Sequence, residues 1–385
     1  MDQAPHCYVF AGGGSGGHLF PGIAVAQQLR QMDPQAMVIF CTTEKHIDDI
    51  IMDGRQWDWF PQPVLPLPSR PWKWWAFYQA WRGSLKVCRE LIETERADCV
   101  LGLGGYASGP ALEVAQEKGV PAALLNPDAV PGKANRWGAA RCERIFTAFA
   151  SSTGSFGVHR EKCRVIGCPV RSEIGEWQRS RAVWSLELDA DRPTLLIMGG
   201  SLGGRNVNEA AQQALLELYE SRQLGQWQIV HITGKGSHRE IMATYDQAGL
   251  KVTTLEFSQE MAMVLAAADL AVCRAGASSV AELSLRGIPM ILLPYPYHRD
   301  QHQWKNAAEY ERVGAAVIVR DEKDATATGH ALKTALTELF FDKEKRQAMG
   351  QAAQQTARAS AAAEIAAELV NMAQRYRRER PECNL

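Results

Sequence analysis

Residues 7–18 of the chain read CYVFAGGGSGGH, an apolar run that passes directly into a glycine-rich loop. The apolar run predicts a buried strand, and a helical pattern begins at about Pro21. Glycines between a strand and a helix allow a tight turn and let backbone N–H groups approach a ligand at the helix N-terminus. The segment therefore predicts the first strand–helix unit of a parallel sheet, with a ligand-binding turn between the two elements.

The same pattern starts again at residues 194–206, which read TLLIMGGSLGGRN. Short apolar runs alternate with longer helical patterns after both glycine loops, which is typical of βαβ units. We expect strands in the first half at 7–11, 37–41, 98–101, 122–125 and 144–147, and in the second half at 194–198, 228–233, 252–257, 270–273, 290–293 and 315–319. The sequence thus predicts an α/β protein with two Rossmann-like, doubly wound parallel sheets.

A boundary between two domains is expected in the segment 167–180, where GCPVR is followed by a charged stretch without strand character. We place an N-terminal domain at 1–172 and a C-terminal domain at 173–385. The Ala-rich segment 351–373 has few helix breakers and predicts a long helix. The last helix of the chain is a candidate to pack back on the N-terminal domain.

The composition is that of a soluble globular protein. A formal net charge of −1 argues against nucleic acid as a partner. Nine cysteines without a C-x-x-C pair, several of them in apolar runs, favour free thiols in a reducing cytosol. The N-terminal residues do not form a signal peptide pattern. We find no apolar run that approaches the roughly 20 residues of a membrane-spanning helix.

Two general motifs also match the glycine loops. Gly12, Gly14 and Gly17 form G-x-G-x-x-G, the pattern of dinucleotide-binding sites, but only the poorly placed Glu44 could act as the ribose-binding acid. Both loops match G-x-S-x-G, the nucleophile elbow of serine hydrolases, without evident acid and histidine partners in the required order. Neither motif explains two dense glycine loops that open two successive domains.

Further segments follow the loops in a recognisable order. They are GGHLFPG at 16–22, GGYASGP at 104–110, AVPGKANR at 129–136, GGSLG at 199–203 with Asn206 and Asn208, CRAGASSVAEL at 273–283, PYP at 294–296, and DQHQ at 300–303 followed by Asn306 and Ala307. This ordered set resembles the MurG family, the N-acetylglucosaminyltransferases of bacterial cell-wall synthesis, from residue 11 to about residue 310. The resemblance implies a GT-B fold, in which two domains face each other across the cleft of the active site.

The resemblance implies that the C-terminal domain binds the donor, UDP-N-acetylglucosamine. Glu282 would accept hydrogen bonds from the two ribose hydroxyls, because a carboxylate is a strong acceptor. His302 and Gln303 would hold the N-acetylglucosamine. The other donor-binding residues implied in this way are Arg171, Ser201, Ala277, Ser278 and Ser279 at the diphosphate, Phe257, Ser258 and Met261 beside the uracil, and Asn208.

The resemblance also implies that the N-terminal domain binds the acceptor, the undecaprenyl-pyrophosphoryl N-acetylmuramyl-pentapeptide called lipid I. Its C4 hydroxyl would attack the anomeric carbon with inversion, giving lipid II. The residues that would bind its pyrophosphate are Gly14, Ser15, Gly16, Gly17, Gly104 and Gly105, and those closest to the reacting hydroxyl are His18, Tyr106 and Asp128. Where most of the family reads HEQN, this chain reads LNPD at 125–128. Three general bases therefore stay open: His18, Asp128 or an ordered water.

No metal ion and no other cofactor is expected. A D-x-D-like pair at a strand end is missing, and we interpret Asp48-Asp49 as surface residues of a helical stretch. The helix N-terminus at Ser201 and the charge of Arg171 could stabilise the leaving diphosphate without a metal.

An aromatic segment at 70–82 reads RPWKWWAFYQAWR. Some of its aromatic residues fall on one helix face, which could pack into the core, but the others lie outside that face. Basic residues flank the segment, and this combination suits the headgroup region of an anionic bilayer. We expect peripheral contact with the cytoplasmic face of a bacterial membrane through Trp72, Trp74, Trp75, Phe77 and Trp81.

Three other functions fit parts of the sequence. Another GT-B nucleotide-sugar transferase, with a different lipid or small-molecule acceptor, would share the C-terminal motifs. An NAD-linked oxidoreductase would use the first glycine loop and leave the second unexplained. A binding protein without turnover would be favoured by the altered segment at 125–128 alone.

Overall fold

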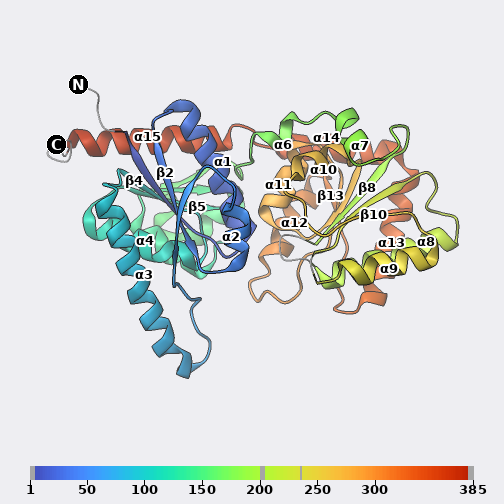
Figure 1. Ribbon diagram of the computed structural model, residues 1–385, viewed down its shortest axis with the longest axis horizontal. Coiled ribbons are helices and arrows are strands. Elements are labelled where there is room, and N and C mark those ends of the chain that lie inside the picture. Colours follow the sequence, from blue (N-terminus) through green and yellow to red (C-terminus); the bar gives the residue numbers. More distant parts are fainter. Residues whose placement is uncertain (1–4, 200–203, 235, 380–385) are drawn as a thin grey trace. The chain divides into compact units, whose positions relative to one another are not determined.

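The computed structural model of the protein describes residues 5–199, 204–234 and 236–379 (Figure 1). The chain forms two compact units, of which the first comprises Met1–Arg171 and Arg358–Leu385 and the second comprises Ser172–Ala357. The chain therefore leaves the first unit at Arg171 and returns to it at Arg358. The last helix, which the sequence left open, belongs to the first unit.

The first unit is built on a seven-stranded parallel sheet with the order β3-β2-β1-β4-β5-β6-β7. Val9 at the centre of β1 lies opposite Ile39 of β2 and Val100 of β4. All residues of β1 are buried, as expected for a strand covered on both faces. The strands are β1 (Cys7–Ala11), β2 (Met37–Thr43), β3 (Asp58–Gln62), β4 (Cys99–Gly102), β5 (Ala122–Asn126), β6 (Arg144–Thr147) and β7 (Cys163–Val165).

Helices cover both faces of this sheet (Figure 1). The first core joins β1 and β2 to α1, α2 and the returning helix α15, which contributes Ile365 and Leu369. The second core joins the opposite face to α3 and α4. The helical elements of the unit are α1 (Gly16–Met32), α2 (His46–Met52), η1 (Pro71–Lys73), α3 (Trp74–Thr94), η2 (Tyr106–Ser108), α4 (Gly109–Lys118), α5 (Lys133–Gly138), η3 (Ala139–Arg141), η4 (Ala150–Lys162) and α15 (Ala361–Glu379).

The second unit repeats the plan with six parallel strands in the order β10-β9-β8-β11-β12-β13. Leu195 and Ile197 of β8 pack against α8, α9 and α13, while the alternate residues Leu196 and Met198 are buried on the other face. The strands are β8 (Thr194–Met198), β9 (Gln228–Ile232), β10 (Thr253–Leu255), β11 (Leu270–Cys273), β12 (Met290–Leu292) and β13 (Ala316–Ile318). The helices are α6 (Glu173–Glu176), α7 (Arg179–Ser185), α8 (Arg205–Glu220), α9 (His238–Ala248), α10 (Met261–Ala267), α11 (Ala277–Leu285), α12 (His302–Arg312), α13 (Ala325–Phe341) and α14 (Lys343–Thr356).

This architecture confirms the predicted fold class of two doubly wound, parallel-sheet α/β domains. Every expected strand is present, with small shifts at the ends, and two edge strands, β3 and β7, were not expected. In the described part of the chain, no helix combines the length and apolar character needed to cross a membrane. The eight cysteines described there are free thiols.

Candidate active site

Each sheet reverses its strand order once, and this reversal fixes where a ligand can bind. In the first unit the chain builds outward from β1 to β3 and then continues on the other side of β1 with β4. In the second unit the same reversal lies between β8 and β11. Ligands of open α/β sheets bind outside the carboxyl ends of the strands at this point. The glycine loop at 12–17 follows β1, and Gly199, where the second glycine-rich segment begins, follows β8, while residues 200–203 lie outside the described part of the chain.

The first glycine loop is held by a buried carboxylate that belongs to α2. Asp48 is fully buried, and its oxygens accept hydrogen bonds from the backbone N–H of Gly14 at 2.8 Å and of Thr43 at 2.9 Å. The hydroxyl of Thr43 donates to the same carboxylate at 2.6 Å. The interpretation of Asp48 as a surface residue was therefore wrong. A local charge pattern does not show that a helical carboxylate is buried against a distant loop.

The rest of this loop forms the N-terminus of α1. Ser15 caps the helix with an extended backbone, and Gly16 and Gly17 begin its first turn. The hydroxyl of Tyr106, at the start of η2, lies 3.4 Å from the position that a Cβ on Gly14 would occupy. Loop, helix N-terminus and Tyr106 therefore lie together, and the Gly14 N–H is bonded to Asp48.

His18 lies on the first turn of α1, against the glycine turn that follows β4. Its Nδ1 atom is 3.2 Å from the carbonyl oxygen of Gly13 and 3.3 Å from the Ser15 hydroxyl. Because a carbonyl oxygen can only accept, the contact with Gly13 requires the hydrogen on Nδ1, and in the neutral tautomer of this kind Nε2 is the basic nitrogen. A Cβ on Gly105 would lie only 2.8 Å from the His18 ring, so the absence of a side chain there makes room for the imidazole.

A chain of amide groups ties this turn to the altered segment 125–128. The N–H of Gly105 donates to Oδ1 of Asn135, and Nδ2 of Asn135 donates to Oδ1 of Asn126 at 2.9 Å. Nδ2 of Asn126 in turn donates to the carbonyl oxygen of Asp128 at 2.7 Å. Asn126 and Asn135 are buried, and Asp128 is half-buried. Sequence reasoning missed both asparagines, although Asn135 stands inside the AVPGKANR segment.

In the second unit, helix α11 presents its N-terminus beyond the carboxyl end of β11. Gly276 caps the helix, Ala277 and Ser278 are buried in its first turn, and Ser279 is half-buried. Glu282 follows on the same helix with a buried side chain, so it is not the solvated surface residue that an isolated glutamate would usually be.

An ion pair at the same edge of the sheet was not foreseen. Nη1 of Arg274, which directly follows β11, donates to Oδ2 of Asp321 at 2.7 Å and to the Leu293 carbonyl at 3.0 Å. Nδ2 of Asn206 donates to the other oxygen of Asp321 at 3.1 Å. Both charged side chains are buried. The network therefore joins the loops after β11, β12 and β13 to the first turn of α8.

Asn208, expected to bind the donor, lies in a second buried network under the same helix. Its Nδ2 donates to the carbonyl oxygen of Thr233 at 2.6 Å, and its Oδ1 lies 3.2 Å from Nε2 of His231. Nδ1 of His231 lies 3.0 Å from the Tyr245 hydroxyl. Burial lowers the pKa of His231 to about 3, so the ring is neutral. The network fixes α8 against the ends of β9 and α9.

The remaining expected donor residues are spread over several elements. Phe257 is exposed, Ser258 is half-buried in the segment before α10, and Met261 is half-buried at the first position of that helix. Arg171 is a buried residue of the first unit, with its guanidinium 4.4 Å from the ring centre of Phe20. Ser201 lies outside the described residues.

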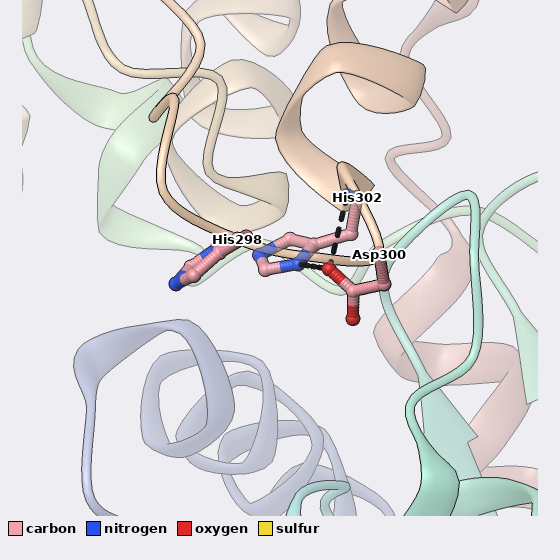
Figure 2. Close-up of side chains that lie close together, drawn as sticks. All are labelled: His298, Asp300 and His302. Atoms are coloured by element: carbon pink, nitrogen blue, oxygen red, sulfur yellow. Dashed lines mark hydrogen bonds and ion pairs between the residues drawn. The ribbon is translucent and has the colours of Figure 1, made fainter. Parts of the chain in front are cut away.

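His302 and Gln303 begin helix α12, and their side chains have different partners. Nδ1 of His302 is 2.9 Å from Oδ1 of Asp300, and its ring stacks on His298 with the ring centres 4.3 Å apart (Figure 2). Oε1 of Gln303 accepts the backbone N–H of Tyr295 at 3.0 Å. Partial burial raises the pKa of Asp300, but the hydrogen bonds and charge of His302 outweigh this and hold that pKa below its usual value.

Two models of glycosyltransferase domains match this chain. The glycosyltransferase family 28 N-terminal domain matches residues 8–147, and the glycosyltransferase family 28 C-terminal domain matches residues 194–365. The UDP-N-acetylglucosamine–N-acetylmuramyl-(pentapeptide) pyrophosphoryl-undecaprenol N-acetylglucosamine transferase of Desulforamulus reducens is 31% identical over 358 residues, which cover 90% of this chain and 93% of that protein. The protein of the same name from Geobacter sulfurreducens is 34% identical over 351 residues, with the same coverage.

A solved structure agrees with these relatives. The crystal structure of MurG from Acinetobacter baumannii superposes with a TM-score of 0.69 at 25% identity, covering 95% of this chain and 100% of that one. The chain belongs to the MurG family. It is therefore a glycosyltransferase, as the ordered motifs predicted. UDP-GlcNAc 2-epimerase from Neisseria meningitidis, with a TM-score of 0.68 at 12% identity, shares the fold alone.

The His298, Asp300 and His302 cluster is the one group of possible metal ligands found in this MurG-family chain within residues 5–199, 204–234 and 236–379. Their ligand atoms lie within 4.8 Å of one another, and two imidazoles with a carboxylate are suitable ligands for zinc. However, the two rings are stacked with only 27° between their planes. Imidazole lone pairs lie in the ring plane, so stacked rings do not direct them toward one shared ion. The expectation that no metal is needed stays a prediction.

The aromatic residues of this MurG-family protein separate into two groups along η1 and α3. Trp81 is half-buried and packs edge-on against Trp137, with Phe77 stacked on Trp81. Trp72 and Trp75, in contrast, are 71% and 68% exposed. The first half of α3 projects beyond the layers of the first unit (Figure 1). The exposed group, which sequence reasoning found only in part, comprises Trp72, Trp74, Trp75 and Tyr78, with Leu65 and Leu67 in the preceding loop.

Proposed function

We propose that this protein transfers N-acetylglucosamine from UDP-N-acetylglucosamine to the C4 hydroxyl of lipid I, and so forms lipid II for peptidoglycan. The observation that carries the proposal is the match to relatives named for this transfer, at 31–34% identity over 90% of the chain. The hydrogen-bonded glycine turn with His18 and the buried α11 N-terminus supply the two kinds of site that the reaction needs.

The second unit binds the donor in this proposal. The N–H groups at the start of α11 receive the diphosphate, since a helix N-terminus carries a partial positive charge and unpaired donors. Glu282, one turn later on the same helix, accepts the ribose hydroxyls. His302 and Gln303 contact the sugar, with Asp300 fixing the His302 ring.

The first unit binds the acceptor. Its pyrophosphate lies at the N-terminus of α1 and beside the Gly104–Gly105 turn. His18 is the general base that we favour among the three candidates, because the Gly13 carbonyl holds the ring through Nδ1, and this tautomer makes Nε2 the nitrogen that takes the C4 hydroxyl proton. Asp128 and Tyr106 position the acceptor sugar.

The proposal is tested by incubating the purified protein with UDP-N-acetylglucosamine, a short-chain analogue of lipid I and a chelator of divalent cations. We expect release of UDP and formation of the disaccharide product with the chelator present. We expect His18→Ala to lower kcat by roughly a hundred- to ten-thousandfold, since that is the usual contribution of a general base, with an unchanged KM for the donor.

Asp128→Asn is the matched comparison, because it removes the competing carboxylate and keeps its size. A loss of kcat in Asp128→Asn as large as that expected for His18→Ala would identify Asp128 as the base. UDP binding without any product from the unmodified protein would contradict the proposed transfer and favour a different acceptor or a binding function.

We further infer that the exposed aromatic group on η1 and α3 contacts an anionic membrane surface, where the lipid acceptor resides. Large apolar side chains at the surface mark an interaction site when they cluster, and Lys73, Arg82 and Lys86 on the same segment supply positive charge. Tryptophan rings suit the headgroup layer, because one edge is apolar and the indole N–H can hydrogen-bond.

Replacing Trp72 and Trp75 together with alanine is expected to lower binding to phosphatidylglycerol–phosphatidylethanolamine vesicles at least tenfold, because burial of each large side chain is worth roughly 1.5–3 kcal/mol. Vesicle sedimentation measures the effect. Trp184→Ala, which removes an 80% exposed tryptophan from the second unit, is the control. Activity toward a water-soluble acceptor analogue should be retained. Equal sedimentation of both variants and the unmodified protein would contradict the membrane contact.

A further inference from the structure

Lys45 lies beside the first glycine loop and has no assigned role. It precedes α2 as the N-cap residue and is exposed. Its ammonium nitrogen is 3.2 Å from the position that a Cβ on Gly14 would take and 5.6 Å from the centre of the Tyr106 ring. The positive charge is therefore located between the glycine loop and Tyr106, at the N-terminus of α1.

The backbone of Lys45 is fixed by the carboxylate that holds the glycine loop. Asp48 binds the N–H and hydroxyl of Thr43 and the N–H of Gly14. The backbone N–H of Lys45 donates to the Thr43 hydroxyl at 3.3 Å, and the N–H of Asp48 donates to the Lys45 carbonyl at 2.8 Å. The buried carboxylate of Asp48 thus connects the turn that carries Lys45 to the first glycine loop.

The local chemistry favours an anion as the partner of this lysine. In the part of the chain that the structure describes, Lys45 forms no ion pair with a carboxylate. The N-terminus of α1 adds a partial positive charge close by, and the carboxylate of Asp48 is already occupied by backbone and hydroxyl donors. Lysine is a common phosphate ligand because its ammonium acts as a compact point charge.

We propose that Lys45 binds the diphosphate of the lipid acceptor, and that Asp48 is a positioning residue that holds Lys45 and the glycine loop in one arrangement. This inference rests on the proposed transfer to lipid I and names a further residue of its acceptor site. Asp48 removes the Gly14 N–H from ligand binding, so the Lys45 ammonium supplies a donor that the loop itself no longer offers.

The first experiment compares Lys45→Ala, Lys45→Arg and the unmodified protein in steady-state transfer to the short-chain lipid I analogue. We expect Lys45→Ala to raise the KM for the acceptor about ten- to hundredfold, the usual effect of losing one charge-assisted hydrogen bond. The KM for UDP-N-acetylglucosamine should not change, and Lys45→Arg should restore most of the acceptor affinity. Lys251→Ala, an exposed lysine of the second unit, is the matched control.

A second experiment separates this inference from the proposed transfer. Binding of a short-chain prenyl diphosphate, which lacks the sugar and peptide, is measured by calorimetric titration of the unmodified protein and of Lys45→Ala. Weaker binding by Lys45→Ala supports the diphosphate contact even if no transfer product is found. Equal affinities, or an unchanged acceptor KM in Lys45→Ala, would overturn the role of Lys45.

Discussion

Replacing Asp321 with alanine is expected to lower the free energy of unfolding of the second unit by about 3–5 kcal/mol, the range found when one partner of a buried ion pair is removed. The variant leaves the guanidinium of Arg274 buried without its carboxylate. It also removes the acceptor of Asn206 and of the Lys323 backbone N–H. Calorimetric unfolding, together with hydrogen exchange of β11 and β12, measures the effect.

Asp324→Ala is the matched control for this prediction. Asp324 is an exposed carboxylate three residues away that caps α13 by accepting the N–H of Ala327. Its loss should lower the free energy of unfolding by about 1 kcal/mol, as for other N-caps. The double variant Arg274→Met/Asp321→Ala should recover part of the stability, because it removes the unpaired charge. A loss in Asp321→Ala no larger than in Asp324→Ala would show that the ion pair does not hold these loops.

Replacing Gly105 with alanine is expected to lower kcat at least a hundredfold. Gly105 has φ +72° and ψ −179°, and adopting this conformation costs a residue with a side chain about 1–3 kcal/mol. A Cβ there would also lie 2.8 Å from the His18 ring, so the imidazole or the turn must move. A displaced general base loses most of its effect, since proton transfer needs hydrogen-bond distance. Steady-state transfer to the lipid I analogue measures the change.

Gly154→Ala is the control for this prediction, because a Cβ on that exposed glycine meets nothing within 4 Å. Both variants should bind UDP with the affinity of the unmodified protein, because the second unit is unchanged. Normal turnover in Gly105→Ala would contradict the close approach of His18 to the glycine turn and would weaken the case for His18 as the base.

The interior of the fold could be predicted from sequence because its strands are continuous apolar runs. The two missed strands lie at the edges of the first sheet, where strands need not be apolar on both faces. β3 contains Pro61 and exposed residues, and β7 has only three residues with an arginine at its centre. Proline is tolerated in an edge strand because one of its sides has no ladder to complete. Such strands become evident from their pairing with a neighbouring strand in the structure rather than from their own composition.

The residues of the two candidate sites also fall into a group that could be predicted from sequence and a group that could not. Glycine loops and the helix that starts at Ala277 leave local signals, because tight turns and helix N-termini demand particular residues at fixed spacing. The groups that hold those loops do not, since Asp48, Asn135 and Asp321 bond to residues 34, 30 and 47 positions away. A polar residue destined for burial looks the same in sequence as one on the surface. Only the assembled sheet shows which carboxylates and amides lie beneath the loops.

Because helix α15 follows the second unit in the chain, the first unit is completed only after the second has been synthesised. The core of the first unit is completed by apolar residues of α15, among them Ile365 and Leu369, which are translated after the whole of the second unit. The second unit is complete at Ala357, before α15 has left the ribosome. At this stage the nascent chain has a finished second unit, while the core on the α1 side of the first unit still lacks the apolar residues of α15. A premature stop codon after residue 357 would leave the apolar residues that α15 normally covers permanently exposed to chaperones and to aggregation.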